Sequence, residues 1–215
     1  MNPGPPRKLA NSQGYAAAKR GLDIIGSTLG LLATAPLWLG GAAAVRIGLG
    51  APVLFRDRRP GLGGRPFMLY KLRTMREPAP GEQRLASDGA RLTRLGRFLR
   101  ATSIDELPSL FNVLRGEMSL VGPRPLLMQY LDRYTPEQAR RHEVKPGLTG
   151  WAQIHGRNAV DWPQRLKLDV WYVDHRSFIL DIEILVRTVA TVVRREGISA
   201  RGQATMGEFM GSESG

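Results

Sequence analysis

The chain has 215 residues, which is enough for one domain with a substantial core and too few for two of ordinary size. Its 31 Lys and Arg residues outnumber its 19 Asp and Glu residues, so the formal net charge is +12. Such an excess favours an anionic partner, for example a phosphate, a nucleic acid or an acidic membrane surface. The absence of cysteine and the lack of paired spacing among the three histidines argue against a zinc site.

An apolar segment near the start of the chain has the length of a membrane helix. It runs from Leu22 to Val45 and is interrupted by Pro36, which removes a backbone donor and kinks or breaks a helix. Residues 1–14, rich in Pro, Gly, Asn and Ser, come before it, and we expect them to form a flexible leader. A single kinked helix that spans the bilayer is one interpretation of this segment.

The basic residues at both ends of the segment favour a different topology. Lys19 and Arg20 precede it, and four arginines follow it, namely Arg46, Arg56, Arg58 and Arg59. Because basic residues favour the cytoplasmic side, a segment with such flanks should enter and leave the membrane on one face. We therefore predict a re-entrant helix-break-helix over residues 15–50, with the break at Pro36.

The remaining sequence predicts a catalytic domain over residues 51–200 that is continuous with the membrane segment. Pro52–Phe55 and Pro66–Tyr70 flank a glycine-rich turn and predict a small β-hairpin. Glu77–Gly89, with its prolines and glycines, predicts a surface loop. We expect residues 201–215 to form a mobile or loosely docked tail.

Three further segments have apolar residues at helical spacing. The first, at residues 91–100, is apolar on one side, and on the other it carries arginines that we expect at an anionic membrane surface: Arg91, Arg94 and Arg97. The second and third, at residues 161–174 and 178–193, are amphipathic, and the third is too charged to span a bilayer. We expect the third to dock on the core or rest on lipid. The predicted fold class is therefore α+β and mainly helical, with amphipathic helices at the membrane surface.

Two adjacent acids, Asp105 and Glu106, stand in a strongly basic region. Asp105 precedes Pro108 by three residues and suits the N-cap of an amphipathic helix that ends at Gly116. The same geometry suits phosphate chemistry, because a helix N-terminus offers free N–H groups to a phosphate beside a carboxylate that can attack it. This stretch alone does not separate the two interpretations.

Other motifs surround these acids. They are Tyr70 to Met75, Asn112 to Pro125, Lys145 to Gln153, Gly156-Arg157 and Leu168 to Tyr172. From about Lys19 to Ile198, the ordered set resembles the bacterial sugar transferase family of monotopic polyprenyl-phosphate phosphoglycosyl transferases.

The resemblance implies a reaction at a membrane. Enzymes of this family move a sugar phosphate from a nucleoside diphosphate sugar to polyprenyl phosphate and release the nucleoside monophosphate. The acid at the position of Asp105 is their nucleophile and forms a covalent phosphosugar intermediate, and the acid at Glu106 helps to hold Mg²⁺. The implied mechanism is ping-pong, with a UDP-sugar and undecaprenyl phosphate as partners.

The resemblance also assigns further residues to the site. Asp169 is implied as a ligand or orienter at the catalytic centre, and the implied substrate-binding residues are Lys71, Arg73, Arg100, Arg124, Gln153 and Arg157. The chain departs from the family pattern at two positions. Ala35 stands where many relatives have a serine whose hydroxyl could bond a backbone carbonyl at the kink, and His155 stands where Asn is usual.

Mg²⁺ suits this set of residues on chemical grounds. A carboxylate can approach the phosphorus of a diphosphate only when cations neutralise the phosphate oxygens, and Mg²⁺ commonly uses one or two carboxylates plus substrate phosphates. We expect Asp105 and Glu106 to hold it. The expected location is the cytoplasmic face of the bacterial inner membrane, with anionic phospholipid as a further partner.

Two other classes of function remain open at this point. The basic composition would also suit a nucleic-acid-binding protein, although aromatic residues are not interleaved with the basic runs and the apolar insertion would have no role. A non-catalytic membrane scaffold would not need the acids at positions 105, 106 and 169. We therefore expect an enzyme and no nucleic-acid partner.

Overall fold

The computed structural model describes residues 12–77, 88–155, 160–194 and 208–211. Helices dominate it, and four strands form two small sheets. The helices and strands are α1 (Ser12–Ala33), α2 (Ala35–Gly48), β1 (Leu54–Pro60), β2 (Pro66–Leu72), α3 (Asp88–Arg91), α4 (Arg94–Ala101), α5 (Leu110–Arg115), β3 (Ser119–Val121), α6 (Pro136–Ala139), β4 (Gly147–Thr149), α7 (Trp151–Ile154), α8 (Trp162–His175) and α9 (Phe178–Arg194). Short 3-10 turns lie at Leu62–Gly64, Ile104–Ser109, Met128–Arg133 and Arg140–Glu143.

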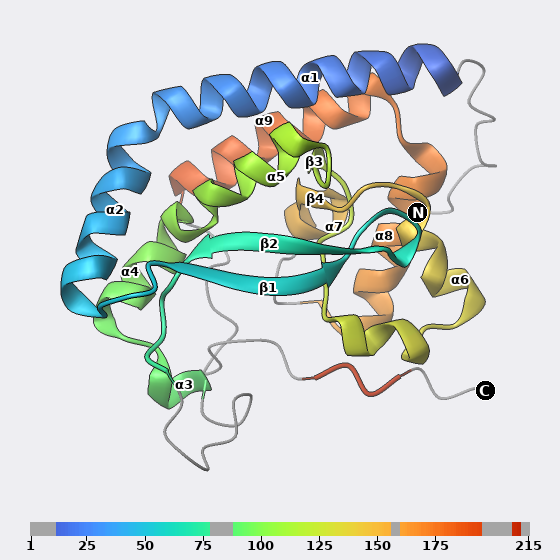
Figure 1. The fold of residues 1–215 in the computed structure, drawn as a ribbon. Helices are drawn as coiled ribbons and strands as arrows, with labels where there is room; N and C mark the ends of the chain where they lie inside the picture. Colours follow the sequence, from blue (N-terminus) through green and yellow to red (C-terminus); the bar gives the residue numbers. More distant parts are fainter. Residues whose placement is uncertain (1–11, 78–87, 156–159, 195–207, 212–215) are drawn as a thin grey trace.

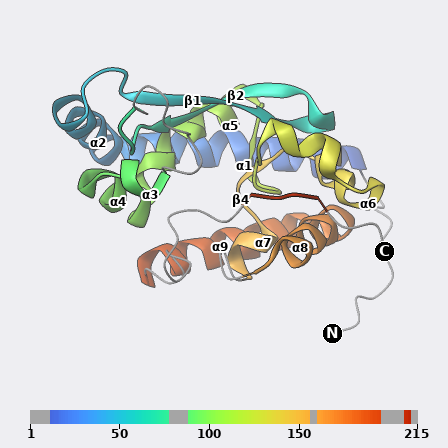
Figure 2. The same ribbon diagram turned by 90° about the horizontal axis from the view of Figure 1, so that it is seen from below.

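The elements are arranged in layers around α1 and α5. Helices α1 and α2 form a bent arm along one edge of the molecule (Figure 1). Figure 2 shows the β1–β2 hairpin on one side of α1 and α5, and helices α7, α8 and α9 on the other. The main core lies between these layers, where Val113, Val121 and Ile184 are fully buried.

The predicted hairpin is confirmed, and its first strand is longer than expected. β1 pairs antiparallel with β2 from Leu54 opposite Leu72 to Pro60 opposite Pro66. The turn depends on Gly63 and Gly64, whose φ angles of 62° and 74° favour glycine. The strand continues through Arg56–Arg59 because a two-stranded ribbon leaves charged side chains open to solvent.

A short parallel sheet was not predicted. β3 pairs with β4, and three glycines allow the backbones to approach closely. A Cβ atom on Gly147 would lie 2.1 Å from the Gly122 nitrogen, and one on Gly150 would lie 2.1 Å from the Gly122 oxygen. Strands of three residues carry too little periodic signal for a sequence-based prediction.

The break between α1 and α2 lies where the proline predicts it. The two helices are bent by 62°, and Pro36 stands in the first turn of α2. Thr34 donates its hydroxyl to the Gly30 oxygen at 2.6 Å, and the Trp38 indole donates to the Leu31 oxygen at 3.3 Å. These two side chains supply hydrogen bonds at the kink, which Ala35 cannot do because it has no hydroxyl.

The arm is apolar on its outer side. Within the described ranges, no single helix is both long and apolar enough to cross a bilayer, whereas α1 and α2 taken together meet that criterion as a bent pair. Large apolar side chains are exposed along both helices, among them Ile25, Leu29, Leu32, Leu37 and Ile47. The inner side of α1 is polar in places, since buried Asp23 accepts hydrogen bonds from the Ser119 hydroxyl and the Leu120 amide, both at 2.9 Å.

Lys19 and Arg20, predicted as a basic membrane flank, instead hold α1 to the protein. Lys19 donates to Asp181 of α9 at 2.9 Å. Arg20 donates to the carbonyls of Val113 and Leu114 at the end of α5, at 2.8 Å and 2.7 Å. These two charges therefore stabilise the fold, and the exposed basic residues of the two flanks are Arg46, Arg56 and Arg58.

Other boundaries also differ from the predictions. α1 begins at Ser12, inside the expected leader, while residues 1–11 lie outside the described part of the chain. The predicted helix at 91–100 is divided, because Thr93 accepts the Gly96 amide and caps α4. Arg91 lies before this cap, is buried and donates to the Arg76 carbonyl, so it does not face a membrane. Most of the loop predicted at 77–89 is outside the described residues.

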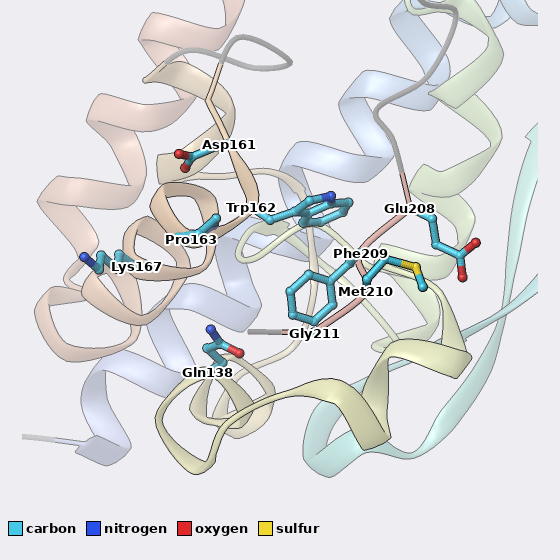
Figure 3. A pocket seen from close by; sticks show the side chains of 9 residues that line it. All are labelled: Gln138, Asp161, Trp162, Pro163, Lys167, Glu208, Phe209, Met210 and Gly211. Carbon is cyan, nitrogen blue, oxygen red and sulfur yellow. The ribbon is translucent and has the colours of Figure 1, made fainter. Parts of the chain in front are cut away.

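Part of the predicted loose tail is docked. Phe209 is only 2% exposed and packs against the rings of Tyr130 and Trp162, with ring centroids 5.6 Å and 5.4 Å away. Figure 3 shows Phe209 beside Trp162. Arg133 holds the neighbouring Glu208 at 2.9 Å. A single aromatic anchor among polar residues has no periodicity, and this explains why the sequence pattern did not reveal it.

Candidate functional site

The two acids of the predicted centre lie in a 3-10 turn, Ile104–Ser109, between α4 and α5. The chain enters this turn through Ser103, a non-glycine residue with φ of 57°. α5 starts after the turn, at Leu110, so the interpretation of Asp105 as an N-cap is wrong. The turn separates Asp105 from that helix and presents Asp105 and Glu106 as neighbours on an irregular segment.

Buried polar contacts fix this turn against β2. Asn112 is fully buried, accepts the Tyr70 amide and donates to the Met68 carbonyl at 2.7 Å. Ser109 donates to the Tyr70 carbonyl at 2.8 Å. These bonds attach the turn and the start of α5 to the edge of β2. The two acids are therefore held beside Lys71, which belongs to β2.

Glu106 is gripped by two cations. Lys71 donates to its Oε1 at 2.7 Å, and Arg124 donates to both of its carboxylate oxygens. Burial raises the pKa of Glu106, but the attraction and hydrogen bonds of Arg124 and Lys71 outweigh it and hold that pKa well below its usual range. Glu106 is therefore an anion at neutral pH.

Asp105 is in the opposite situation. It is 6% exposed, and no hydrogen bond or ion pair engages its carboxylate among the described residues. Burial, together with the charge of Glu106, raises its pKa to about 6, against the lowering effect of Lys71, Arg100 and Arg124. A buried carboxylate with no donor attached is poorly stabilised as an anion, which makes it a better nucleophile.

Two predicted phosphate ligands, Arg100 and Arg124, lie in the electrostatic surroundings of Asp105. Arg100 is placed by a hydrogen bond from its Nε to the Thr74 hydroxyl at 3.1 Å. Arg124 follows Pro123 on a loop that leaves β3, and its side chain is about one third exposed. Both arginines can therefore meet a phosphate that approaches Asp105.

Arg73 was predicted to bind substrate and has a different role. Its guanidinium donates to the carbonyls of Leu49 and Gly50 at the end of α2, the latter at 2.8 Å. The side chain is buried, and these carbonyls are the ones that a helix end leaves without partners. Arg73 caps α2, and the sequence motif alone could not distinguish a capping arginine from a phosphate ligand.

Asp169 does not contact the two acids directly. It is 2% exposed on α8, and its Oδ2 accepts Nε and Nη2 of Arg141 at 3.1 Å and 2.8 Å. Arg141 also donates to the main-chain oxygen of Arg124 at 2.7 Å. Of the two implied roles, ligand and orienter, these contacts support the second. Arg141 was not predicted, because a second arginine in a basic turn carries no distinguishing pattern.

The predicted nucleotide-binding segment is only partly described. Gln153 lies in α7, and both polar atoms of its amide are buried without a hydrogen-bond partner. A buried amide in this state is costly, so a ligand that pairs with it would be favoured. Arg157 lies outside the described residues.

Metal binding would depend on few ligands. Among the described residues, no group of three or more His, Asp or Glu side chains could hold a metal ion. Asp105 and Glu106 nonetheless fit the usual Mg²⁺ arrangement of one or two carboxylates completed by substrate phosphates. A cavity of about 670 Å³ lies elsewhere, beside the docked tail, and none of the predicted site residues lines it (Figure 3).

The sequence is similar to known transferases over nearly its whole length. The model of the family described as bacterial sugar transferase matches residues 14–195. The uncharacterized sugar transferase EpsL of Bacillus subtilis is 53% identical over 90% of this chain and 96% of its own length. The UDP-glucose:undecaprenyl-phosphate glucose-1-phosphate transferase of Caulobacter vibrioides is 45% identical over 81% of this chain and 69% of its own length.

Other relatives are longer than this chain. The UDP-N-acetylgalactosamine-undecaprenyl-phosphate N-acetylgalactosaminephosphotransferase of Aeromonas hydrophila is 40% identical over 87% of this chain, which covers 46% of that protein. The matched part of each relative contains the segment that carries Asp105 and Glu106 here, since the alignments cover most of this chain.

Proposed function

The chain belongs to the bacterial sugar transferase family, and from this premise we propose that it moves a sugar 1-phosphate from a UDP-sugar to undecaprenyl phosphate and releases UMP. It is a phosphoglycosyl transferase, as its relatives are named undecaprenyl-phosphate sugar phosphotransferases. The product, a lipid-linked sugar, would start the assembly of a glycoconjugate or exopolysaccharide.

One observation carries the mechanism: two adjacent acids have opposite environments. Glu106 is fixed as an anion by Lys71 and Arg124, whereas Asp105 is buried and has no donor among the described residues. Neighbouring acids whose pKa values are pushed apart usually have different roles in catalysis. Asp105 is the group that is free to form a bond.

The proposed reaction has two displacements at one phosphorus atom. In the first, a carboxylate oxygen of Asp105 attacks the phosphorus that carries the sugar, the bond to the bridging oxygen breaks, and UMP leaves with that electron pair. In the second, a phosphate oxygen of undecaprenyl phosphate attacks the same phosphorus, and the Asp105 carboxylate leaves. Arg100 and Arg124 offset the charge of the phosphate oxygens in both steps.

Mg²⁺ belongs to the proposal as a cofactor. Glu106, together with Asp105, would hold it, and the ion would neutralise diphosphate charge. Lys71 and Arg124 donate to the oxygens of Glu106, so these cations keep that carboxylate ionised and hold it in place beside Asp105.

We also propose the membrane arrangement that the bent arm supports. The 62° bend between α1 and α2 and the exposed apolar side chains along both helices suit insertion into one leaflet, with both ends on the cytoplasmic face of the inner membrane. The exposed arginines at and after the end of α2, Arg46, Arg56 and Arg58, favour that face. Labels attached at residues 15 and 56 should then react from the same side of sealed vesicles. Reaction from opposite sides would establish a spanning helix instead.

The mechanism is tested by trapping the covalent intermediate. The protein in nanodiscs is mixed with Mg²⁺ and UDP-glucose, UDP-galactose or UDP-N-acetylgalactosamine, without lipid acceptor, and then quenched in acid and weighed by mass spectrometry. The productive donor should add the mass of one sugar phosphate to a peptide that contains Asp105. The exposed variant Asp132→Asn should form the adduct normally. Accumulation of lipid-linked product without any adduct would reject the covalent mechanism.

A further inference from the structure

Arg141 joins two residues of the site that do not touch each other. Its guanidinium donates twice to Asp169 of α8 and once to the main-chain oxygen of Arg124. Its side chain is 1% exposed and that of Asp169 is 2% exposed. The pair is therefore sealed from solvent, while Arg124 at its far end remains open to a ligand.

The loop that carries Arg124 is fixed residue by residue up to that point. The Gly122 amide donates to the Thr149 carbonyl and the Gly147 amide donates to the Pro123 carbonyl, both at 2.9 Å. Arg141 continues the series at the Arg124 carbonyl. Arg141, which Asp169 of α8 holds, thus sets the position of the Arg124 backbone. The reach of the Arg124 side chain to Glu106 depends on that position.

We propose that Arg141 is a positioning residue, which Asp169 orients and which sets the Arg124 main chain so that the guanidinium of Arg124 grips Glu106 and the donor phosphate. The proposal deepens the phosphoglycosyl transfer proposed above and rests on it. Asp169 then acts at a distance, through Arg141, and is not a ligand of Mg²⁺ or of substrate.

The fork of an arginine is what this role requires. Nε and Nη2 point to one carboxylate oxygen while the same Nη2 reaches a carbonyl, a planar arrangement that one guanidinium provides. A lysine at position 141 could still pair with Asp169 as a point charge but could not hold both partners in this geometry. Arg141→Lys therefore separates the ion pair from the positioning function.

The test compares three variants in nanodiscs, with the fastest donor of the panel and UMP release as the assay. Arg141→Lys should keep a thermal unfolding midpoint near that of the wild type and lose about 100-fold in kcat, since a displacement of about 1 Å at a phosphate ligand has that effect. Asp169→Asn should lose activity to a similar extent. The double variant Arg141→Lys with Asp169→Asn should be no slower than the slower single variant, because the residues act as one unit.

Two further measurements distinguish positioning from other roles. The Mg²⁺ concentration for half-maximal rate should be unchanged in Asp169→Asn and raised in Glu106→Gln. Arg140→Gln is the matched control, because Arg140 neighbours Arg141 and pairs with Asp174 of α8, as well as with Glu137 and Glu143, but donates to no residue of the site. It should retain normal activity.

The outcomes that overturn the proposal are distinct from a failure of the proposed function. Wild-type kcat in Arg141→Lys would reduce the pair to a structural ion pair, and additive losses in the double variant would show independent roles. A raised Mg²⁺ requirement in Asp169→Asn would make Asp169 a metal ligand. A wild-type protein that releases no UMP with any donor would instead reject the proposed function.

Discussion

Two carboxylates in this protein are held in similar ways, Glu106 at the site and Asp181 in α9. Each accepts a hydrogen bond from a lysine ammonium: Glu106 from Lys71 at 2.7 Å and Asp181 from Lys19 at 2.9 Å. The Asp181 cluster is completed by two hydroxyls, those of Tyr15 and Tyr172, and its carboxylate is fully buried. The Glu106 cluster is completed by an arginine and remains one fifth exposed.

The difference between the clusters lies in what surrounds the ion pair. Asp181 ties α1 to α8 and α9, and every partner is used inside the protein. Glu106 stands next to Asp105, an acid with no donor among the described residues, and near the partly open Arg124. An ion pair alone does not mark a functional site. A neighbouring acid without a partner, together with cations that remain accessible, does.

The largest effect should come from removing the unpartnered acid. Asp105→Asn preserves shape but cannot attack phosphorus, so UMP release should fall by at least about 1,000-fold, as for other lost nucleophiles. The thermal unfolding midpoint should not fall, because burial of this carboxylate without a donor is unfavourable in the wild type. Assays of UMP release and thermal unfolding on one preparation check both statements. Activity close to wild type would mean that the two clusters do not differ in this way.

The matching change in the other cluster should affect stability instead. Asp181→Asn removes a fully buried anion and leaves the Lys19 ammonium, whose side chain is 16% exposed, without it; the loss of one partner of such a pair costs about 3 kcal/mol of unfolding free energy. Denaturant or thermal unfolding in detergent measures this, and the activity per folded molecule should be unchanged. Glu183→Gln is the control on the same helix, because its pair with Arg187 is exposed and should contribute less than about 1 kcal/mol. Lost turnover in fully folded Asp181→Asn would show that this cluster also serves the reaction.

A smaller effect is expected from pH. The pKa of Asp105 is raised to about 6 and the attacking form is the anion, so kcat/KM for the donor should fall as the pH falls below 6. The loss should reach about tenfold for each pH unit below that value. The acid limb of the pH profile is expected near 6 because burial and the charge of Glu106 disfavour the Asp105 anion. An acid limb near 4, the ordinary range for Asp, would show that burial and Glu106 do not raise the pKa of Asp105.

The sequence anticipated the elements that have a strong period or a strong breaker. The helices α8 and α9 were predicted to within a residue or two, and so was the break in the arm, because Pro36 removes a donor wherever the fold places it. The glycines of the hairpin turn acted in the same way. These signals are local, and local chemistry is what a sequence pattern can carry.

The site was harder to predict because several arginines look alike in a sequence. Arg73, Arg124 and Arg141 are a helix cap, a candidate phosphate ligand and a buried link to Asp169. Which role each takes depends on the carbonyls and carboxylates that the fold brings to it. For the same reason the net charge of the chain overstates its free positive surface, since cations such as Lys19 and Arg20 are used inside the protein.

The smallest effect is expected from a change that loosens the arm at its bend rather than at Asp181. Thr34→Val keeps the shape of the side chain and removes the hydroxyl that donates to the Gly30 oxygen. That oxygen still accepts the Thr34 amide at 3.0 Å, so the loss should be about 1 kcal/mol, the value of one hydrogen bond. Thermal unfolding in detergent measures it, and adding Trp38→Phe, which removes the indole donor to Leu31, should roughly double the loss. If the pair of changes leaves stability intact, the bend is held by Pro36 and by packing of the arm, and Asp181 remains the polar contact that fixes the arm to the body.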